Sequence, residues 1–166
     1  MNTQITVVHP FEPVYDENSK ILILGSFPSV KSREQGFYYA HPQNRMWKIL
    51  SIILNTKIGA SADDKKCFLL DYNIAMWDVL LKCDITGSAD SSIKNIIPAD
   101  LTPVIDYGKL RAVFCNGGVS YKYYLKFDKN KFGLPVFKMP STSPANARYR
   151  LEHLVSTWSA IKDYLY

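Results

Sequence analysis

An apolar run that ends in glycine, Lys20-Ile-Leu-Ile-Leu-Gly25, limits the fold of this chain more than any other feature. The run has no polar face, so it predicts a strand buried on both sides, as in a parallel sheet covered by helices. Further strands are expected at 74–80, 111–116 and 134–139, and helices at 45–54, 63–72, 100–106, 119–127 and 148–164. A long loop is expected at 26–44 and a polar loop at 82–92. Strands that alternate with helices predict an α/β/α sandwich around a parallel sheet.

The length of 166 residues suits one domain, in which residues 1–19 form an N-terminal arm. The N-terminus has no signal-peptide pattern, and no apolar run approaches the ~20 residues of a membrane span. We therefore expect a soluble, cytoplasmic protein with no membrane partner. The cysteines at 67, 83 and 115 form no C-x-x-C pattern, which excludes a four-thiolate metal site within one chain and predicts buried free thiols. No His, Cys and carboxylate cluster predicts another metal.

The charge and the aromatic content favour a polyanionic partner. The net charge is +5, aromatic residues make up 13% of the chain, and residues 120–150 carry seven lysines and arginines against Asp128 alone. A local excess of positive charge is typical of a surface that binds nucleic acid. A solvated lysine-rich helix and loop would have the same composition, so the pattern alone leaves both interpretations open.

Three unusual loops follow predicted strands. They are Gly25-Ser-Phe-Pro-Ser29, Asn116-Gly-Gly118 and Pro140-Ser-Thr-Ser-Pro-Ala-Asn146. The carboxyl ends of parallel strands lie at one edge of a sheet, where ligands bind in such folds, so these loops are expected to meet there. The first loop matches no phosphate-binding pattern, and the chain lacks G-x-S-x-G, so neither a nucleotide cofactor nor a hydrolase elbow is expected.

The segment before the first long helix combines aromatic and hydrogen-bonding side chains. Tyr38 and Tyr39 are followed by His41 and Asn44, a combination that suits a planar heterocycle with polar edges. His41 is a candidate proton donor, although a single loop histidine is more often structural. In the alternative interpretation the tyrosines anchor the loop and Asn44 caps the helix. Capping and function are compatible.

The loop 140–146 is a candidate phosphate contact. Hydroxyl groups between prolines, loop N–H groups and a helix N-terminus are good phosphate ligands, and the prolines pre-order the loop. The alternative is a loop that only caps the last helix.

Taken in order, these motifs resemble the uracil-DNA glycosylase superfamily, and most closely its hypoxanthine-DNA (deoxyinosine) glycosylase branch. The resemblance rests on Gly25–Pro28, Gly36–Trp47, Asn116–Gly118 and Pro140–Asn146, and spans about Ile21 to Trp158. It implies a four-stranded parallel sheet between helices, no cofactor, and hydrolysis of an N-glycosidic bond after the damaged nucleotide is flipped out of double-stranded DNA.

The resemblance also implies roles for individual residues. Asn44 corresponds to the pocket asparagine to which catalysis is attributed in this branch, Tyr39 to the aromatic that stacks on the flipped base, and Asn116 to a contact with the base edge. The full set of substrate-binding candidates is Ser26, Phe27, Tyr38, Tyr39, His41 and Asn116. The DNA-binding candidates are Ser141, Thr142, Ser143, Asn146 and Arg148.

Two departures from the pattern narrow the expected substrate. Mismatch-type uracil glycosylases carry Gly-x-Asn-Pro in the first loop, where the asparagine positions water, and this chain has Phe27 there. The last motif commonly begins His-Pro-Ser or Asn-Pro-Ser, and here begins with Met139. Both departures favour hypoxanthine over uracil. No motif lysine is placed to form a Schiff base, so a monofunctional glycosylase is expected. We also expect the protein to be a monomer. The alternatives are a uracil or mismatch glycosylase and an inactive DNA-binding member of the fold.

Overall fold

The computed structural model describes residues 3–107 and 109–166. Its strands are β1 (Gln4–Val8), β2 (Ile21–Gly25), β3 (Ile74–Asp78), β4 (Leu80–Thr86), β5 (Lys94–Pro98), β6 (Ala112–Asn116) and β7 (Val136–Met139). Its α-helices are α1 (Val30–Gln35), α2 (Met46–Ile53), α3 (Ala62–Asp71), α4 (Thr102–Tyr107), α5 (Gly118–Phe127), α6 (Leu151–Trp158) and α7 (Lys162–Leu165). Short 3₁₀ turns cover Asp90–Ser92 and Ser159–Ile161.

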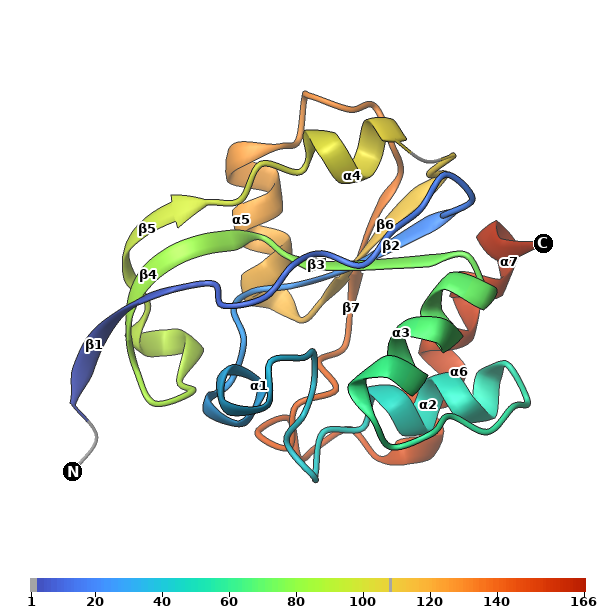
Figure 1. The fold of residues 1–166 in the computed structure, drawn as a ribbon, viewed down its shortest axis with the longest axis horizontal. Coiled ribbons are helices and arrows are strands. Elements are labelled where there is room, and N and C mark those ends of the chain that lie inside the picture. Colours follow the sequence, from blue (N-terminus) through green and yellow to red (C-terminus); the bar gives the residue numbers. More distant parts are fainter. Residues whose placement is uncertain (1–2, 108) are drawn as a thin grey trace.

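A four-stranded parallel sheet in the order β3-β2-β6-β7 forms the centre of the molecule. Strands β2 and β3 are buried at every position, as the continuous apolar run predicts. Helix α5 packs on one side of the sheet, and helices α2, α3, α6 and α7 gather on the other (Figure 1). The predicted α/β/α sandwich and its four strands are therefore confirmed.

The helices cover the sheet with the faces that their apolar spacing predicts. In α2 the buried residues are Met46, Ile49, Leu50 and Ile53, one side of a helix with 3.6 residues per turn. Trp158 of α6 is fully buried, and its Nε1–H donates to Pro140 O over 3.0 Å. This bond ties the last helix to the loop that follows β7.

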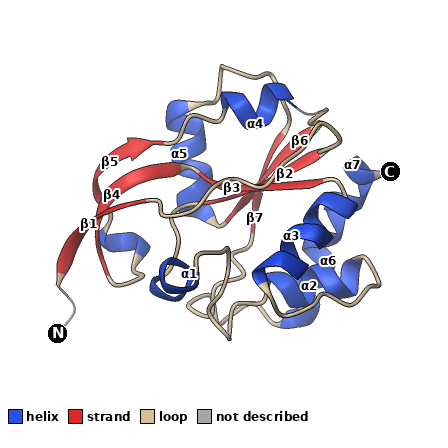
Figure 2. Ribbon diagram, viewed as in Figure 1, coloured by secondary structure: helices blue, strands red, loops and turns tan. Residues whose placement is uncertain are grey.

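A second, antiparallel sheet corrects one expectation and adds a strand to the N-terminal arm. The arm 1–19 contains strand β1, and the segment 82–92, expected to be a polar loop, contains most of β4; with β5 they form the order β1-β4-β5 (Figure 2). Strand β4 buries Cys83 and Ile85 but leaves the alternating polar residues Lys82, Asp84 and Thr86 partly exposed. Its charged residues make the segment look like a loop in the sequence. In an antiparallel sheet, however, one face of a strand can be exposed to solvent and carry such residues.

Three smaller expectations also change. The loop 26–44 contains α1, which begins after the Ser29 N-cap and ends at Gly36, whose φ of 72° is the left-handed conformation typical of a helix end. The last helix begins at Leu151 rather than 148 and passes through a 3₁₀ turn into α7. Cys67 is exposed, because it lies on the outer side of α3, whereas Cys83 and Cys115 are buried and free as expected.

Across the described residues, no helix combines the length and the apolar character that crossing a membrane requires.

Candidate active site

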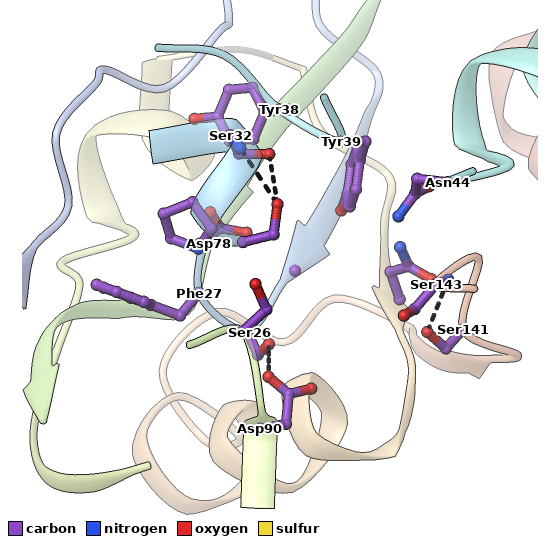
Figure 3. A pocket seen from close by; sticks show the side chains of 15 residues that line it. Ser26, Phe27, Ser32, Tyr38, Tyr39, Asn44, Asp78, Asp90, Ser141 and Ser143 are labelled. Carbon is purple, nitrogen blue, oxygen red and sulfur yellow. Dashed lines mark hydrogen bonds between the residues drawn. The ribbon is translucent and has the colours of Figure 1, made fainter. Parts of the chain in front are cut away.

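A pocket opens at the carboxyl edge of the central sheet, where the sequence places its unusual loops. Strands β2, β3 and β6 end in Gly25, Asp78 and Asn116, which line it, and the loop after β7 adds Ser141 and Ser143 (Figure 3). The loop between α1 and α2 completes the wall with Tyr38, Tyr39 and Asn44. Strand ends and loops that are far apart in the chain therefore build one cavity.

The side-chain amide of Asn44 is held in one orientation. Its Oδ1 accepts two hydrogen bonds, from Met46 N at 3.0 Å and from Thr142 Oγ1 at 2.8 Å. With the oxygen engaged, the Nδ2 group points into the pocket (Figure 3). Asn44 thus bonds the first residue of α2, although the N-cap position itself is Arg45 and not Asn44. It also presents an amide donor to the cavity.

Thr142 links the two pocket asparagines. Asn116 Nδ2 donates to Thr142 Oγ1, and Thr142 N donates to Asn116 Oδ1, each over 3.0 Å. Thr142 is fully buried, and its hydroxyl donates in turn to Asn44. Satisfied networks of this kind fix side-chain positions in a low-dielectric interior.

Arg45 fastens the loop after β7 to the start of α2. Its guanidinium donates to the carbonyls of Ser143, at 2.9 Å, Asn146, at 3.1 Å, and Tyr149. Its backbone N–H adds a bond to Thr142 O at 3.1 Å. A planar group with several fixed donors holds several carbonyls at once, which lysine cannot do.

The two neighbouring tyrosines have different environments. Tyr38 is only 2% exposed, and its hydroxyl donates to Glu12 O over 2.9 Å, so it anchors the loop in the core. Tyr39 has a φ of 51°, a left-handed conformation that is uncommon outside glycine, and its buried hydroxyl has no hydrogen-bond partner among the described residues. Burial raises the pKa of both phenols, so both stay protonated at neutral pH.

A buried carboxylate and histidine lie at the inner end of the pocket. Asp78 Oδ2 is 2.7 Å from His9 Nε2, and the two side chains are 5% and 0% exposed. His9 Nδ1 accepts from Phe11 N at 3.5 Å, so Nε2 carries the proton that is donated to Asp78. Asp78 Oδ1 has no hydrogen-bond partner in the part of the chain that the structure describes. A Cβ added at Gly25 would lie only 2.3 Å from that oxygen.

A second carboxylate, Asp90, lies at the mouth of the pocket. Its Oδ1 accepts a hydrogen bond from Ser26 Oγ over 3.0 Å (Figure 3). Asp90 as a residue is exposed to solvent, but the protein atoms around its carboxyl raise the pKa above its ordinary value. The bond from Ser26 lowers that pKa, and the nearby charge of Asp78 raises it further. The net effect is a carboxyl that takes up a proton more readily than a solvated aspartate.

An outer groove adjoins the pocket. Its lining shares Asp90, Asn116, Ser141 and Ser143 with the pocket. The groove also contains Gly117, Gly118, Lys138, Asn146 and Arg148. Lys138 and Arg148 are two of the seven cations of residues 120–150, and both are exposed. A small-residue floor beside two cations can accommodate a phosphate backbone.

Comparison with known proteins assigns the fold to a family. Residues 12–162 match the sequence model of the uracil DNA glycosylase superfamily. The chain belongs to this superfamily. It is 33% identical over 153 residues to a hypoxanthine DNA glycosylase of Methanosarcina acetivorans, a match that covers 91% of this chain and 95% of the relative. The corresponding protein of Methanosarcina barkeri is 34% identical over 120 residues, covering 68% and 73%.

A solved structure agrees with the superfamily assignment. The solution NMR structure of a uracil-DNA-glycosylase-type protein from Methanosarcina acetivorans has a TM-score of 0.80 and 31% sequence identity. The match covers 97% of this chain and 99% of that one. The resemblance to the superfamily that the motifs indicate is therefore confirmed over nearly the whole chain.

Within the superfamily fold, most of the predicted site residues come together. The pocket brings together Ser26, Phe27, Tyr38, Tyr39, Asn44, Asn116, Ser141 and Ser143. The groove contains Asn146 and Arg148. His41 instead lines a separate hollow with Trp47 and Lys65, on the other side of the Tyr39–Asn44 segment. Thr142 lies behind the pocket wall, so its side chain supports the asparagines and does not reach the DNA-facing surface.

Four residues in or beside the candidate site were not predicted from the sequence. Arg45 is part of the quoted motif, but its role depends on carbonyls about 100 positions away. Asp78 ends a strand, and that position is the signal that could have identified it. Asp90 lies in a segment expected to be a polar loop, and His9 in the arm, so nothing in the sequence placed either beside the pocket.

Among residues 3–107 and 109–166, no three His, Cys, Asp or Glu side chains cluster as a metal site would require.

Proposed function

We propose that this protein is a monofunctional DNA glycosylase that excises hypoxanthine from double-stranded DNA. The observation that carries the proposal is the fixed amide of Asn44, whose oxygen is engaged twice and whose NH₂ group faces the pocket. Membership of the superfamily, and the two relatives named as hypoxanthine DNA glycosylases, support the same activity.

Asn44 supplies the stabilisation that the chemistry needs. When the C1′–N9 bond breaks, its electron pair goes to the base, and negative charge develops on the leaving purine. An oriented N–H donor in a dry pocket stabilises that charge, and removing one such donor typically costs ~10²–10³ in rate. Tyr39 stacks on the flipped base, and Phe27 and Tyr38 complete the apolar wall.

The inner carboxylate supports discrimination against adenine. Hypoxanthine presents an N1–H donor where adenine presents an N1 acceptor, and the free Oδ1 of Asp78 is an acceptor. His9 keeps the carboxylate in place through its bond to Oδ2. In this proposal Oδ1 is occupied by the base edge, so Asp78 is not available to accept a proton from water. An adenine in the same position would leave Oδ1 facing a lone pair, and sites built around a hydrogen bond reject such analogues strongly. In this proposal Asn116 contacts the base edge.

The outer groove is proposed to bind the DNA backbone. Ser141, Ser143, Asn146 and Arg148 provide the hydroxyl, amide and guanidinium groups that contact phosphates. The whole chain is proposed to act as one domain, as a monomer in the cytoplasm, with no cofactor. Sedimentation at micromolar concentration measures the molecular mass in solution, and we expect the mass of a single chain.

The activity is tested on a labelled duplex with a single deoxyinosine, with excess protein and alkaline cleavage of the abasic product. We expect excision by the wild type and a ~10²–10³-fold slower reaction in Asn44→Ala. Asn18→Ala, at an exposed asparagine outside the pocket, is the matched control and is expected to retain full activity. An unchanged excision rate in Asn44→Ala would contradict the catalytic role of the Asn44 amide. A wild type that does not excise hypoxanthine would contradict the proposed function.

Uracil excision is the second candidate, because uracil also presents an N–H, at N3, to an acceptor such as Asp78. Phe27 disfavours uracil excision, because its side chain has no polar group that could position water beside the smaller base. The same duplex with uracil in place of hypoxanthine decides between the two, and we expect hypoxanthine to be removed at least about tenfold faster. DNA binding without release of any base would instead indicate an inactive member of the superfamily.

A further inference from the structure

The pocket and the outer groove share four lining residues. The place where the two cavities meet indicates where the reacting carbon of a bound nucleotide would lie. Asp90, Asn116, Ser141 and Ser143 line both cavities. A flipped nucleotide has its base in the pocket and its phosphates in the groove. Its C1′ atom, which joins base to backbone, must then lie at the junction. The residues that surround C1′ are therefore these four.

Asp90 is the one ionisable side chain among the four. Its carboxylate is fixed by the bond from Ser26 Oγ at the pocket mouth (Figure 3). A negative charge beside a phosphate backbone opposes DNA binding, whereas Lys138 and Arg148, farther along the groove, favour it. A carboxylate kept at this point in spite of that repulsion has a chemical use there.

We propose that Asp90 is the general base that orients and deprotonates the attacking water. The proposal rests on the glycosylase function above. The water oxygen bonds to C1′, its proton passes to the Asp90 carboxylate, and the C1′–N9 bond breaks with its electrons leaving on the base. The purine then takes up a proton from solvent. The products are free hypoxanthine and an abasic deoxyribose in an unbroken strand.

The surroundings of Asp90 suit a proton acceptor. Phe27 and Met139 carry no proton-accepting group into the site, and Asp78, on strand β3, is engaged with His9 deep in the pocket. The other titratable groups around Asp90 are Asp78, Cys83 on strand β4, and Lys138 and Arg148 in the groove. Burial raises the pKa of the Cys83 thiol to about 11, so it stays neutral and does not compete as a base at neutral pH.

The test is single-turnover excision from the deoxyinosine duplex by wild type, Asp90→Asn and Asp90→Ala, with DNA affinity measured separately by fluorescence anisotropy. We expect a rate loss of ~10²–10⁴-fold in both variants, the usual contribution of a general base. DNA affinity is expected to stay equal or to rise, because a negative charge has been removed. Asp71→Asn, an exposed carboxylate on α3 outside both cavities, is the matched control and should retain the wild-type rate.

The pH profile separates a base from a structural role. The wild-type rate should rise with pH as Asp90 ionises, and Asp90→Asn should lose that rise. Ser26→Ala removes the bond that lowers the Asp90 pKa, so its rise should move to higher pH. An Asp90→Asn rate within about threefold of wild type, or an unchanged acid limb in that variant, would overturn the role of Asp90 alone. A wild type inactive on hypoxanthine would overturn the proposed function and this proposal with it.

Discussion

Thr142 Oγ1 donates a hydrogen bond to Asn44 Oδ1 over 2.8 Å, between residues 98 positions apart in the chain. The same hydroxyl accepts from Asn116 Nδ2, so one buried threonine orients both pocket amides. Without this contact the Asn44 amide could rotate and present its oxygen to the base. An acceptor in that place would repel the negative charge of the leaving group instead of stabilising it.

Replacing Thr142 with valine tests this relationship. The change keeps the side-chain shape but removes both hydroxyl bonds, so we expect excision to slow by about 10–100-fold. The free energy of unfolding should fall by about 1–3 kcal/mol, because Asn116 Nδ2 loses its partner inside the protein. Thr142→Ser keeps the hydroxyl and should recover most of the rate. Equal activity in the valine variant, measured by single-turnover assay, would show that Asn44 is oriented by Met46 N alone.

Arg45→Lys is expected to loosen the loop 140–149 without unfolding the protein. Lysine keeps the charge but cannot hold several carbonyls at once, so amide hydrogen exchange in this loop should speed up and DNA affinity should fall. Arg111→Lys, which affects contacts near the carboxyl terminus, is the control. Loop exchange as slow as in the wild type would show that the guanidinium bonds are dispensable.

The His9–Asp78 pair is expected to be a large contributor to stability. Phenylalanine at position 9 leaves the Asp78 carboxylate buried without its donor, and an unsatisfied buried polar group typically costs about 1–3 kcal/mol, more when it is charged. Urea unfolding measures the loss. His153→Gln, on the exposed side of α6, should change stability by less than about 0.5 kcal/mol. A His9→Phe loss equally small would show that the bond from His9 to Asp78 contributes little to stability.

Asp78→Asn is expected to change which base is accepted. The amide can present a donor to adenine N1, so the ratio of hypoxanthine to adenine excision should fall by at least about tenfold. The ratio is the informative quantity, because a general loss of stability lowers both rates alike. Competition between the two duplexes in one reaction measures it directly, and an unchanged ratio would exclude Asp78 from base recognition.

The groove cations should set the salt dependence of DNA binding. Lys138→Gln and Arg148→Gln should each reduce the slope of log affinity against log salt concentration by about 1, since each releases about one counterion from the DNA. Lys57→Gln, an exposed lysine outside the outer groove, should leave the slope unchanged. Binding titrations between about 50 and 200 mM salt measure the slopes, and equal slopes would place the phosphates elsewhere.

The central sheet can be predicted from the sequence because its strands are buried on both sides, and a continuous apolar run such as 21–24 fits few structures besides a fully covered strand. The position of the site follows from the same rule, since loops after parallel strands share one edge. The small sheet was not predicted because β4 alternates charged and apolar residues over a short length, like a loop. Asp90 lies in the segment expected to be a loop, so its place beside the pocket was not predicted. Arg45 and His9 contact residues far away in the chain, and a local sequence pattern cannot predict such contacts.

The absence of a side chain at Gly25 leaves space at the inner end of the pocket. A Cβ at this position would lie only 2.3 Å from Asp78 Oδ1 and 3.0 Å from the Tyr39 hydroxyl oxygen. The space in which a base edge can meet the carboxylate therefore exists because a side chain is missing. If Asp78 reads the base as proposed, Gly25→Ala places a methyl group against the carboxylate and should narrow the range of bases that the pocket accepts.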